Sequence, residues 1–170
     1  MTIHDFIMEK KIGGGKFGTV HRAIHIKTKS IYALKKISKS LLESHMMIDQ
    51  FILEFKIQSY LSHKNIVQVY GMFSDKHFLY LIMEYLPDGT LYSLLKKKKH
   101  LPEKEVAFTI KQIAKAIAYM HSEGCVHRDL KPENIVMNGN TCKICDFGWA
   151  TVCEDQRRQT YCGTFDYTAP

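Results

Sequence analysis

Two short loops between residues 127 and 148 carry the side chains best suited to chemistry. The first holds Asp129, Lys131 and Asn134, and the second begins with Asp146. Because Mg²⁺ prefers oxygen ligands, the Asn134 amide oxygen and the Asp146 carboxylate can bind it while phosphate oxygens fill other positions. Asp129 is placed to accept or orient a hydroxyl proton, and Lys131 adds positive charge for a moving phosphoryl group. Together the loops predict Mg-assisted phosphoryl transfer.

Regular elements are expected on both sides of these loops. Strands at 135–137 and 142–145 form a hairpin-like pair between the loops. Residues 90–95 begin a short helix, and residues 102–122 form a long helix with proline at its start and glutamates in its first turn. A glycine ends this helix and leads into the first loop. Its apolar face is expected to pack, and comprises Val106, Ile110, Ile113, Ile117 and Met120.

The N-terminal third predicts three strands over residues 6–37 with a glycine-rich turn between the first two. Glycines stand at 13, 15 and 18 in the spacing G-x-G-x-x-G, but β-branched residues follow where a dinucleotide-binding fold would start a helix. Backbone amides in such a hairpin can approach phosphates closely because no side chain intervenes, and Phe17 can cap them. Taken alone, the motif is also compatible with an ordinary tight turn.

Lys35 on the third strand needs an anionic partner, and it is the lysine expected to touch the first two phosphates of a nucleotide. Apolar residues over 46–61 are spaced close to a helical period, and Glu54 lies on this helix. Glu54 is the best candidate to pair with Lys35, because a partly buried ammonium is costly without a carboxylate. Glu43 and Asp49 are rival partners, and Glu54 is otherwise a solvated helix charge.

Residues 66–73 and 77–84 predict two further strands, which gives a sheet of five. Proline and glycine in residues 84–89 make this segment a connector between two lobes. Its backbone groups can bind an adenine edge, between apolar walls from both sides. The candidate nucleotide-binding residues are Ile12, Gly13, Gly14, Gly15, Lys16, Phe17, Gly18, Val20, Ala33, Lys35, Met83, Glu84, Leu86 and Val136.

Composition limits the class of protein. The chain has 170 residues, 45% of them hydrophobic, and a formal net charge of +7, so it can build a packed core. This positive charge is compatible with an anionic partner or with a basic soluble protein. The sequence contains no aromatic-basic platform for nucleic acid. The lysines at 96–99 are expected to be solvated. No apolar run approaches the roughly 18 residues that span a bilayer, and no signal peptide is recognisable, so we expect an intracellular protein without a membrane partner.

Five cysteines in no secreted framework are expected to be reduced thiols. Cys142 and Cys145 have the spacing of a zinc knuckle, but no second ligand pair follows and the segment alternates like a strand. The expected metal is therefore Mg²⁺ at the loops rather than zinc at the thiols.

The chain resembles a eukaryotic protein kinase. Four motifs agree in order: the glycine-rich hairpin, the strand lysine, H-R-D at 127–129 and D-F-G at 146–148. The resemblance implies a bilobal α+β fold, with a five-stranded antiparallel N-lobe sheet, one long helix and a partial, mainly helical C-lobe. The implied parts are an N-lobe over 1–84, a hinge over 85–89 and a partial C-lobe over 90–170, with the domain continuing past Pro170.

The resemblance also implies roles for the residues that match the motifs. Asp129 is then the base, Asn134 and Asp146 hold metal, and Lys35 pairs with Glu54. ATP and Mg are the implied cofactors. Lys131, two positions after the aspartate, resembles the serine/threonine class.

The segment after the second loop is most similar to the Aurora kinase family. Tryptophan follows D-F-G, and residues 157–167 read R-R-x-T-x-C-G-T-x-D-Y. This similarity implies that Thr160 is an activating phosphorylation site, modified by a second copy of the protein. A phosphate on Thr160 would place a charge of about −1.5 to −2 beside Arg128. Glu133 is a candidate acceptor of substrate arginine. Thr164 resembles the family residue that steadies Asp129 and Lys131.

By resemblance, the expected activity is ATP-dependent phosphorylation of serine or threonine in basic, histone-like proteins. The implied setting is mitotic chromosome segregation and spindle control in the nucleus, at centromeres and chromosomes and on the spindle, with an activating partner on the N-lobe. The alternative is a nucleotide-binding or scaffold fragment without transfer activity, because helices that support the catalytic loop are expected beyond Pro170.

Overall fold

The computed structural model describes residues 1–15, 17–152 and 163–167. The chain forms two compact units. Unit 1 comprises Met1–Phe51 and Gln68–Tyr85, and unit 2 comprises Ile52–Val67 and Leu86–Pro170. The sequence predicted an N-lobe over 1–84, which would include residues 52–67. In the structure these residues group with unit 2. The division into lobes and hinge remains a prediction.

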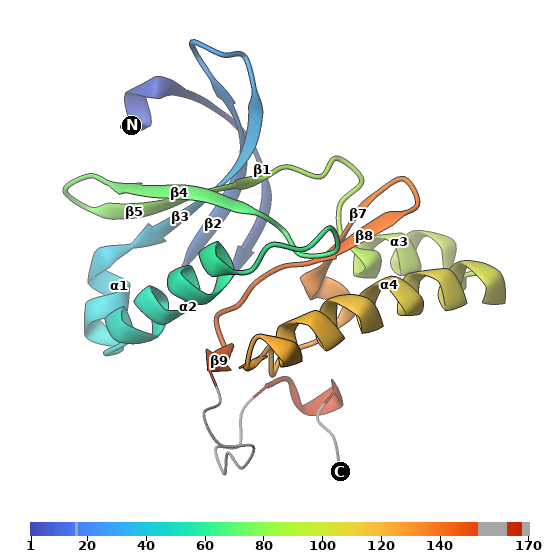
Figure 1. Cartoon of the computed structure of the whole chain (residues 1–170). Helices are drawn as coiled ribbons and strands as arrows, with labels where there is room; N and C mark the ends of the chain where they lie inside the picture. The colour runs from blue at the N-terminus through green and yellow to red at the C-terminus, as the bar shows by residue number, and fades with distance from the viewer. Residues whose placement is uncertain (16, 153–162, 168–170) are drawn as a thin grey trace. The chain divides into compact units, whose positions relative to one another are not determined.

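Unit 1 is built on a five-stranded antiparallel sheet with the order β1-β2-β3-β5-β4 (Figure 1). This confirms the sheet expected from the sequence. Ile66, which was expected to begin the fourth strand, instead makes an isolated bridge to Ile144 in unit 2. The strands are β1 (Phe6–Gly15), β2 (Gly18–His25), β3 (Ile31–Ser38), β4 (Val69–Ser74) and β5 (Phe78–Glu84).

One face of this sheet carries an apolar and aromatic core. Phe6 stacks on Phe73 with ring centroids 5.7 Å apart, and Phe73 stacks on Tyr80 at 4.7 Å. Leu34 and Ile82 are buried in the same unit. Aromatic rings bury large areas, so this row ties the first strand to the last two and holds the sheet rigid.

The helix expected over 46–61 is present as α2 (Ile48–Tyr60), and a second, short helix precedes it. Helix α1 (Lys39–Ser44) was not expected; Ser38 caps it by accepting a hydrogen bond from Leu41 N at 3.4 Å. Met46 has a left-handed φ of 54°, which interrupts the helical path before α2 (Ile48–Tyr60) begins. Nothing in a methionine side chain signals such a conformation, so apolar spacing alone placed the start of the helix two residues too early, at 46 instead of Ile48.

In the described residues, unit 2 contains the C-terminal part of α2, helices α3 and α4, and two short antiparallel strand pairs, β6–β9 and β7–β8, around one core (Figure 1). The predicted helices and the predicted hairpin are confirmed as α3, α4 and β7–β8, although Cys145 lies just after the hairpin. Within the described residues, no helix combines the length and apolar composition needed to cross a bilayer. The elements are α3 (Leu91–Lys98), α4 (Glu103–Ser122), β6 (Cys125–Val126), η2 (Pro132–Asn134), β7 (Ile135–Asn138), β8 (Thr141–Ile144), β9 (Thr151–Val152) and η3 (Phe165–Tyr167), while η1 (Ile3–Asp5) belongs to unit 1.

Helix α4 buries only part of the face that was expected to pack. Met120 is buried, and Ile113 and Ile117 pack partly against the unit 2 core. Val106 and Ile110 are exposed, at 41% and 55%. Because β6 and β8 are the strands that α4 contacts, the described residues cover the helix along those strands and leave its N-terminal turns open.

Candidate active site

Both ends of the first loop are fixed by strands. Gly124, with a φ of 69°, ends α4 and turns the chain into β6, which pairs with β9 through Cys125 with Val152 and Val126 with Thr151. At the other end of the loop, η2 runs directly into β7. The loop therefore lies between two anchored strands, which limits the positions its side chains can take.

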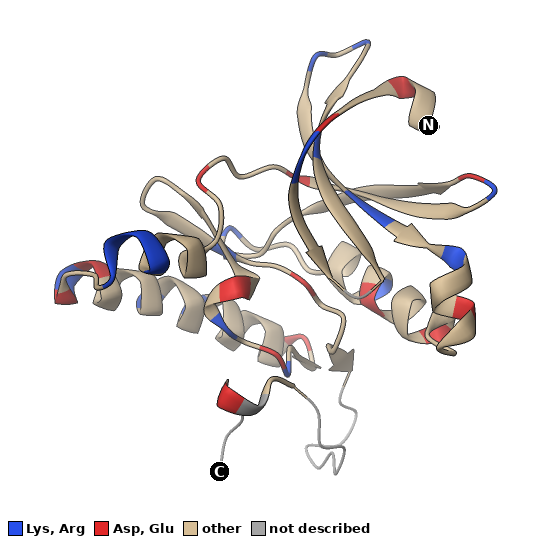
Figure 2. Cartoon of the chain, turned by 180° about the vertical axis from the view of Figure 1, so that it is seen from behind, with Lys and Arg blue, Asp and Glu red and all other residues tan. Residues whose placement is uncertain are grey.

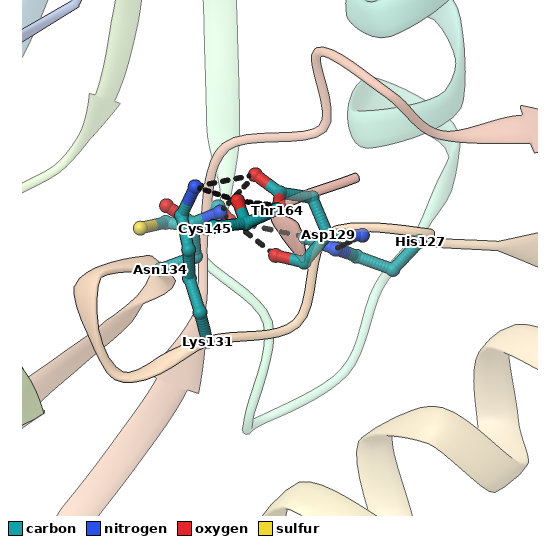
Figure 3. A network of polar contacts seen from close by, with 6 residues as sticks. All are labelled: His127, Asp129, Lys131, Asn134, Cys145 and Thr164. Atoms are coloured by element: carbon teal, nitrogen blue, oxygen red, sulfur yellow. Dashed lines mark hydrogen bonds and ion pairs between the residues drawn. The ribbon is translucent and has the colours of Figure 1, made fainter. Parts of the chain in front are cut away.

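His127 joins the two loops (Figure 3). Its Nδ1 accepts a hydrogen bond from Asp129 N at 3.3 Å, so the proton lies on Nε2, which donates to Cys145 O at 3.1 Å. The imidazole is 2% exposed and makes an edge contact with the Phe147 ring, with centroids 4.9 Å apart. Burial lowers the pKa of His127, against the opposing effect of the Cys145 carbonyl and nearby carboxylates. The ring is therefore a neutral connector.

Asp129 lies at the centre of a polar network (Figure 3). Thr164 Oγ1 donates to its Oδ1 at 2.6 Å, and Lys131 Nζ lies 2.8 Å from its Oδ2. Asn134 Nδ2 donates to both Asp129 O, at 2.9 Å, and Oδ2, at 3.1 Å. Lys131 Nζ also donates to Thr164 Oγ1 at 2.7 Å. The structure thus brings together four of the residues singled out from the sequence and fixes the orientation of a carboxylate that is 6% exposed.

The donor set beside Asp129 fits a hard cation. Both amide hydrogens of Asn134 are directed to Asp129, which leaves the amide oxygen as the atom that can bind a metal. Cys145 N donates to the backbone oxygen of Asn134 at 2.9 Å, so the backbone that leads into Asp146 is held beside Asn134. Among the described residues, no group of three or more His, Cys, Asp or Glu forms a metal cage. One carboxylate with one amide, completed by phosphate oxygens, is the pattern expected for Mg²⁺.

The second loop is fixed by its apolar residue. Phe147 is fully buried in the unit 2 core, whereas Asp146 is exposed and has a left-handed φ of 61°. A left-handed residue is uncommon outside glycine and marks a locally constrained backbone. The constraint turns the carboxylate out of the core. A Cβ added at Gly148 would lie 3.6 Å from both Asp146 Oδ1 and Glu54 Oε2, so Glu54 is close to this loop.

Several candidate nucleotide-binding residues are cross-strand neighbours in unit 1. Val20 pairs with Gly13 on one side and with Lys35 on the other, and Ala33 pairs with Met83. Ala33 and Met83 are buried, whereas Ile12 is 41% exposed. Glu84 ends β5, and its carboxylate accepts a hydrogen bond from Gln68 N at 3.3 Å.

Other predicted residues belong to unit 2 or lie outside the described residues. Leu86 and Val136 are in unit 2, where Val136 bridges to Thr90. Glu54 is 6% exposed and also belongs to unit 2, whereas Lys35 is in unit 1, so the ion pair between them stays a prediction. The predicted residues Lys16 and Thr160 lie outside the described residues.

The glycine-rich hairpin passes a test of fit for phosphates. Neither Gly13 nor Gly15 has a left-handed φ. A Cβ added to Gly13 would make only ordinary van der Waals contact with Val20, and a Cβ added to Gly15 would have no atom within 4 Å. A Cβ added at Gly14 would meet the end of the flexible Lys11 side chain at 3.0 Å and the backbone oxygen of Gly18 at 3.4 Å. The fold itself therefore does not require glycine at positions 13 and 15. Space kept free of side chains next to backbone amides is what a phosphate needs.

Two features of the site were not found from the sequence. Cys145 contributes through its backbone, which bonds to both His127 and Asn134, and a residue type carries no signal for such contacts. Arg128 Nε donates to Trp149 O at 2.7 Å from a backbone with φ 65°, which links the first loop to the segment after the second. Glu133, proposed from the sequence as a substrate contact, has a buried Oε2 without a hydrogen-bond partner among the described residues.

We expect acid to destabilise this chain through His127. Since its folded pKa lies below the unfolded value near 6.5, the unfolded chain binds the extra proton first, and stability falls as pH drops below about 6.5. Replacing His127 by Gln should reduce the slope of the unfolding free energy against pH by up to about 1.4 kcal/mol per pH unit. Urea unfolding between pH 7 and pH 5 measures this slope in both proteins. Because His63, whose pKa is also lowered, is present in both, an unchanged slope in the His127→Gln protein would contradict the assignment.

The chain is similar to known proteins over nearly its whole length. The family described as "Protein kinase domain" matches residues 6–170. Aurora kinase of Eremothecium gossypii is 41% identical over 100% of this chain and 47% of its own length. Aurora kinase A-A of Xenopus laevis is 43% identical over 99% of this chain and 42% of its own length. Aurora kinase B of Mus musculus is 40% identical over 99% of this chain and 49% of its own length. The chain thus spans somewhat less than half the length of these relatives.

Proposed function

The chain belongs to the protein kinase domain family. On that premise we propose that it is an Aurora-type kinase, which transfers the γ-phosphate of ATP to serine or threonine of protein substrates. The observation that carries this proposal is the Asp129 network. A buried carboxylate held by Thr164, Lys131 and Asn134 is oriented to accept a hydroxyl proton. Similarity to Aurora kinases over 99–100% of the chain supports the finer assignment.

Each residue then has a chemical task. Asp129 orients the acceptor hydroxyl and takes its proton, while Lys131 stabilises charge on the transferred group. Asn134 and Asp146 would hold Mg²⁺, and Lys35, paired with Glu54, would hold the first phosphates. ATP supplies the phosphoryl group, and Mg²⁺ neutralises phosphate charge. The residues proposed to surround the nucleotide are Ile12, Gly13, Gly14, Gly15, Lys16, Phe17, Gly18, Val20, Ala33, Met83, Glu84, Leu86 and Val136.

The proposed substrates are basic proteins, including histone-like ones. The unpartnered buried oxygen of Glu133 supports this proposal, because a carboxylate oxygen without a donor can accept a substrate arginine. Thr160 is the proposed activating phosphorylation site. Arg128 is the proposed phosphate ligand: its Nε bonds to Trp149 O, and its other guanidinium nitrogens can bind phosphate. Resemblance to Aurora kinases further supports a role in mitosis in the nucleus, at the centromere and on the spindle, with an activating partner on the N-lobe.

Three otherwise identical arginine-containing peptides, with serine, threonine or tyrosine as the acceptor, test the proposed activity. Incubation with γ-labelled Mg-ATP should label the serine and threonine peptides and leave the tyrosine peptide unlabelled. Labelling of tyrosine alone would overturn the serine/threonine assignment.

The second candidate function is nucleotide binding or scaffolding without phosphoryl transfer, and the observation that favours it is the cross-strand grouping of Gly13, Val20, Lys35, Ala33 and Met83 in unit 1. A rise in melting temperature with Mg-ATP, without label transfer to any peptide, would support it. No shift and no transfer would reject both functions for this chain.

A further inference from the structure

A buried asparagine outside the proposed phosphotransfer site holds three segments of unit 2 together. Asn65 is 1% exposed, and its Nδ2 donates to Cys142 O at 2.7 Å and to Gln112 Oε1 at 2.9 Å. Its backbone oxygen accepts a hydrogen bond from Ile144 N at 2.8 Å. The loop after α2, helix α4 and strand β8 therefore meet at one point, and the side chains beside these contacts share one surface.

The side chains that share this surface are basic. Lys64 precedes Asn65, Lys143 lies between its two partners on β8, and Lys115 is on α4 less than one turn after Gln112. His63 accepts a hydrogen bond from Asn65 N at 3.1 Å and stacks on Tyr119, with centroids 5.2 Å apart. Burial lowers the pKa of His63, and the three lysines lower it further, which agrees with their positions around the ring.

The stretches of the three segments that flank the Asn65 contacts contain no acidic residue, although α4 begins with Glu103 and Glu105, and Glu123 just after it accepts a hydrogen bond from Tyr60 Oη at 2.9 Å. Residues 55–67, 106–122 and 134–145 include no Asp or Glu, yet they carry five lysines. Lys64, Lys111 and Lys115 are exposed, and Lys111 and Lys115 are four residues apart on α4, so they lie on the same side of the helix. The local field is therefore positive, because five lysines in these stretches outnumber the glutamates at the two ends of α4.

We propose that Lys64, Lys111, Lys115 and Lys143, the Asn65 surface, dock an acidic polypeptide segment of a partner protein. The charge of the surface selects glutamate- or aspartate-rich sequence, and its rigid base favours specific docking because little ordering is needed on binding. The proposal is independent of phosphoryl transfer, since none of these residues belongs to the Asp129 network or the candidate nucleotide set.

An acidic polypeptide fits this surface better than nucleic acid does. Affinity for nucleic acid through phosphates grows with the number of phosphates neutralised, and four lysines can neutralise only a few. Single strands also require aromatic faces for base stacking, and His63 and Tyr119 already stack on each other with ring planes 18° apart. Four cations around a compact centre match a short run of carboxylates.

Fluorescence anisotropy with a fluorescein-labelled glutamate-rich peptide at low ionic strength tests the proposal. We expect saturable binding that added salt weakens, and a Kd that rises about fivefold in K64Q/K115Q, because two exposed charge contacts are lost. The matched control is K96Q/K97Q, two exposed lysines in the last turn of α3, where Figure 2 shows a continuous basic segment. The control should change Kd by less than about twofold.

Three results would overturn the proposal. These are no binding of the peptide, an equal loss of affinity in the control, or tighter binding of a single-stranded oligonucleotide of the same net charge through Lys64 and Lys115. Equal melting temperatures for the three proteins establish that the exposed substitutions leave the fold intact. Unchanged Mg-ATP binding in K64Q/K115Q would separate this surface from the proposed nucleotide site.

Discussion

Replacing Asp129 by Asn should lower the rate of phosphoryl transfer by about a thousandfold, within the range that a positioned general base contributes. The amide cannot take up a proton from the acceptor hydroxyl. It also places an N–H₂ group among Lys131, Asn134 and Thr164, which direct hydrogen-bond donors to the carboxylate. Label transfer from γ-labelled Mg-ATP to the serine peptide measures the loss, and an unchanged rate would contradict the assignment of the base.

The nucleotide should still bind to this variant, because Asp129 is proposed to contact the acceptor hydroxyl rather than ATP. The increase in melting temperature with Mg-ATP should therefore match that of the unsubstituted chain. A variant that loses both transfer and the thermal shift would indicate a damaged fold, and the rate would then say nothing about a base. The two measurements together separate chemistry from binding.

Thr164 provides an independent check on the same carboxylate. T164S retains the hydroxyl that donates to Asp129 and accepts from Lys131, so transfer should remain near the original rate. T164V loses the hydroxyl at nearly equal volume, and we expect kcat to fall about tenfold with little change in KM for ATP, because only the orientation of Asp129 changes. Equal activity in T164S and T164V would remove Thr164 from the site.

The local parts of the site could be predicted because their residues are close in sequence. Asp129, Lys131 and Asn134 lie within one loop, and the hairpin that follows brings Asp146 back beside them. Thr164 is different, since it is 35 residues from Asp129 and no spacing rule spans that distance. Only the resemblance to a kinase family identified it. The backbone contacts of Cys145 had no signal at all, because they depend on where the chain passes.

The fold shows a similar limit. Alternating apolar residues and turn residues located the five strands, because a half-buried sheet imposes a period of two. The same kind of pattern overestimated the packing of α4, where Val106 and Ile110 belong to a helical stripe that the described residues do not cover. Periodicity identifies the apolar side of an element, whereas the neighbour that covers it depends on residues distant in sequence.

The glycine-rich hairpin gives the second large effect, in which neighbouring glycines should respond differently. In Gly18→Ala, the new Cβ would overlap the carbonyl oxygen of Lys36 on β3, and backbone cannot move as a side chain can. We expect the free energy of unfolding to fall by about 3 kcal/mol, as for a badly overpacked site. Urea denaturation measures this change, and a loss below about 0.5 kcal/mol would contradict the close approach of β2 and β3.

In Gly15→Ala, by contrast, the new methyl group meets nothing within 4 Å and the backbone φ is not left-handed, so stability should stay within about 0.5 kcal/mol of the parent. The cost should appear only when nucleotide binds, because the methyl group takes space next to amides proposed to contact phosphate. A Kd for Mg-ATP about tenfold weaker is expected from calorimetry, a loss typical of one displaced charged contact. Since Gly15→Ala keeps the fold and Gly18→Ala weakens it, unchanged Mg-ATP affinity in the first variant would show that the hairpin is an ordinary tight turn.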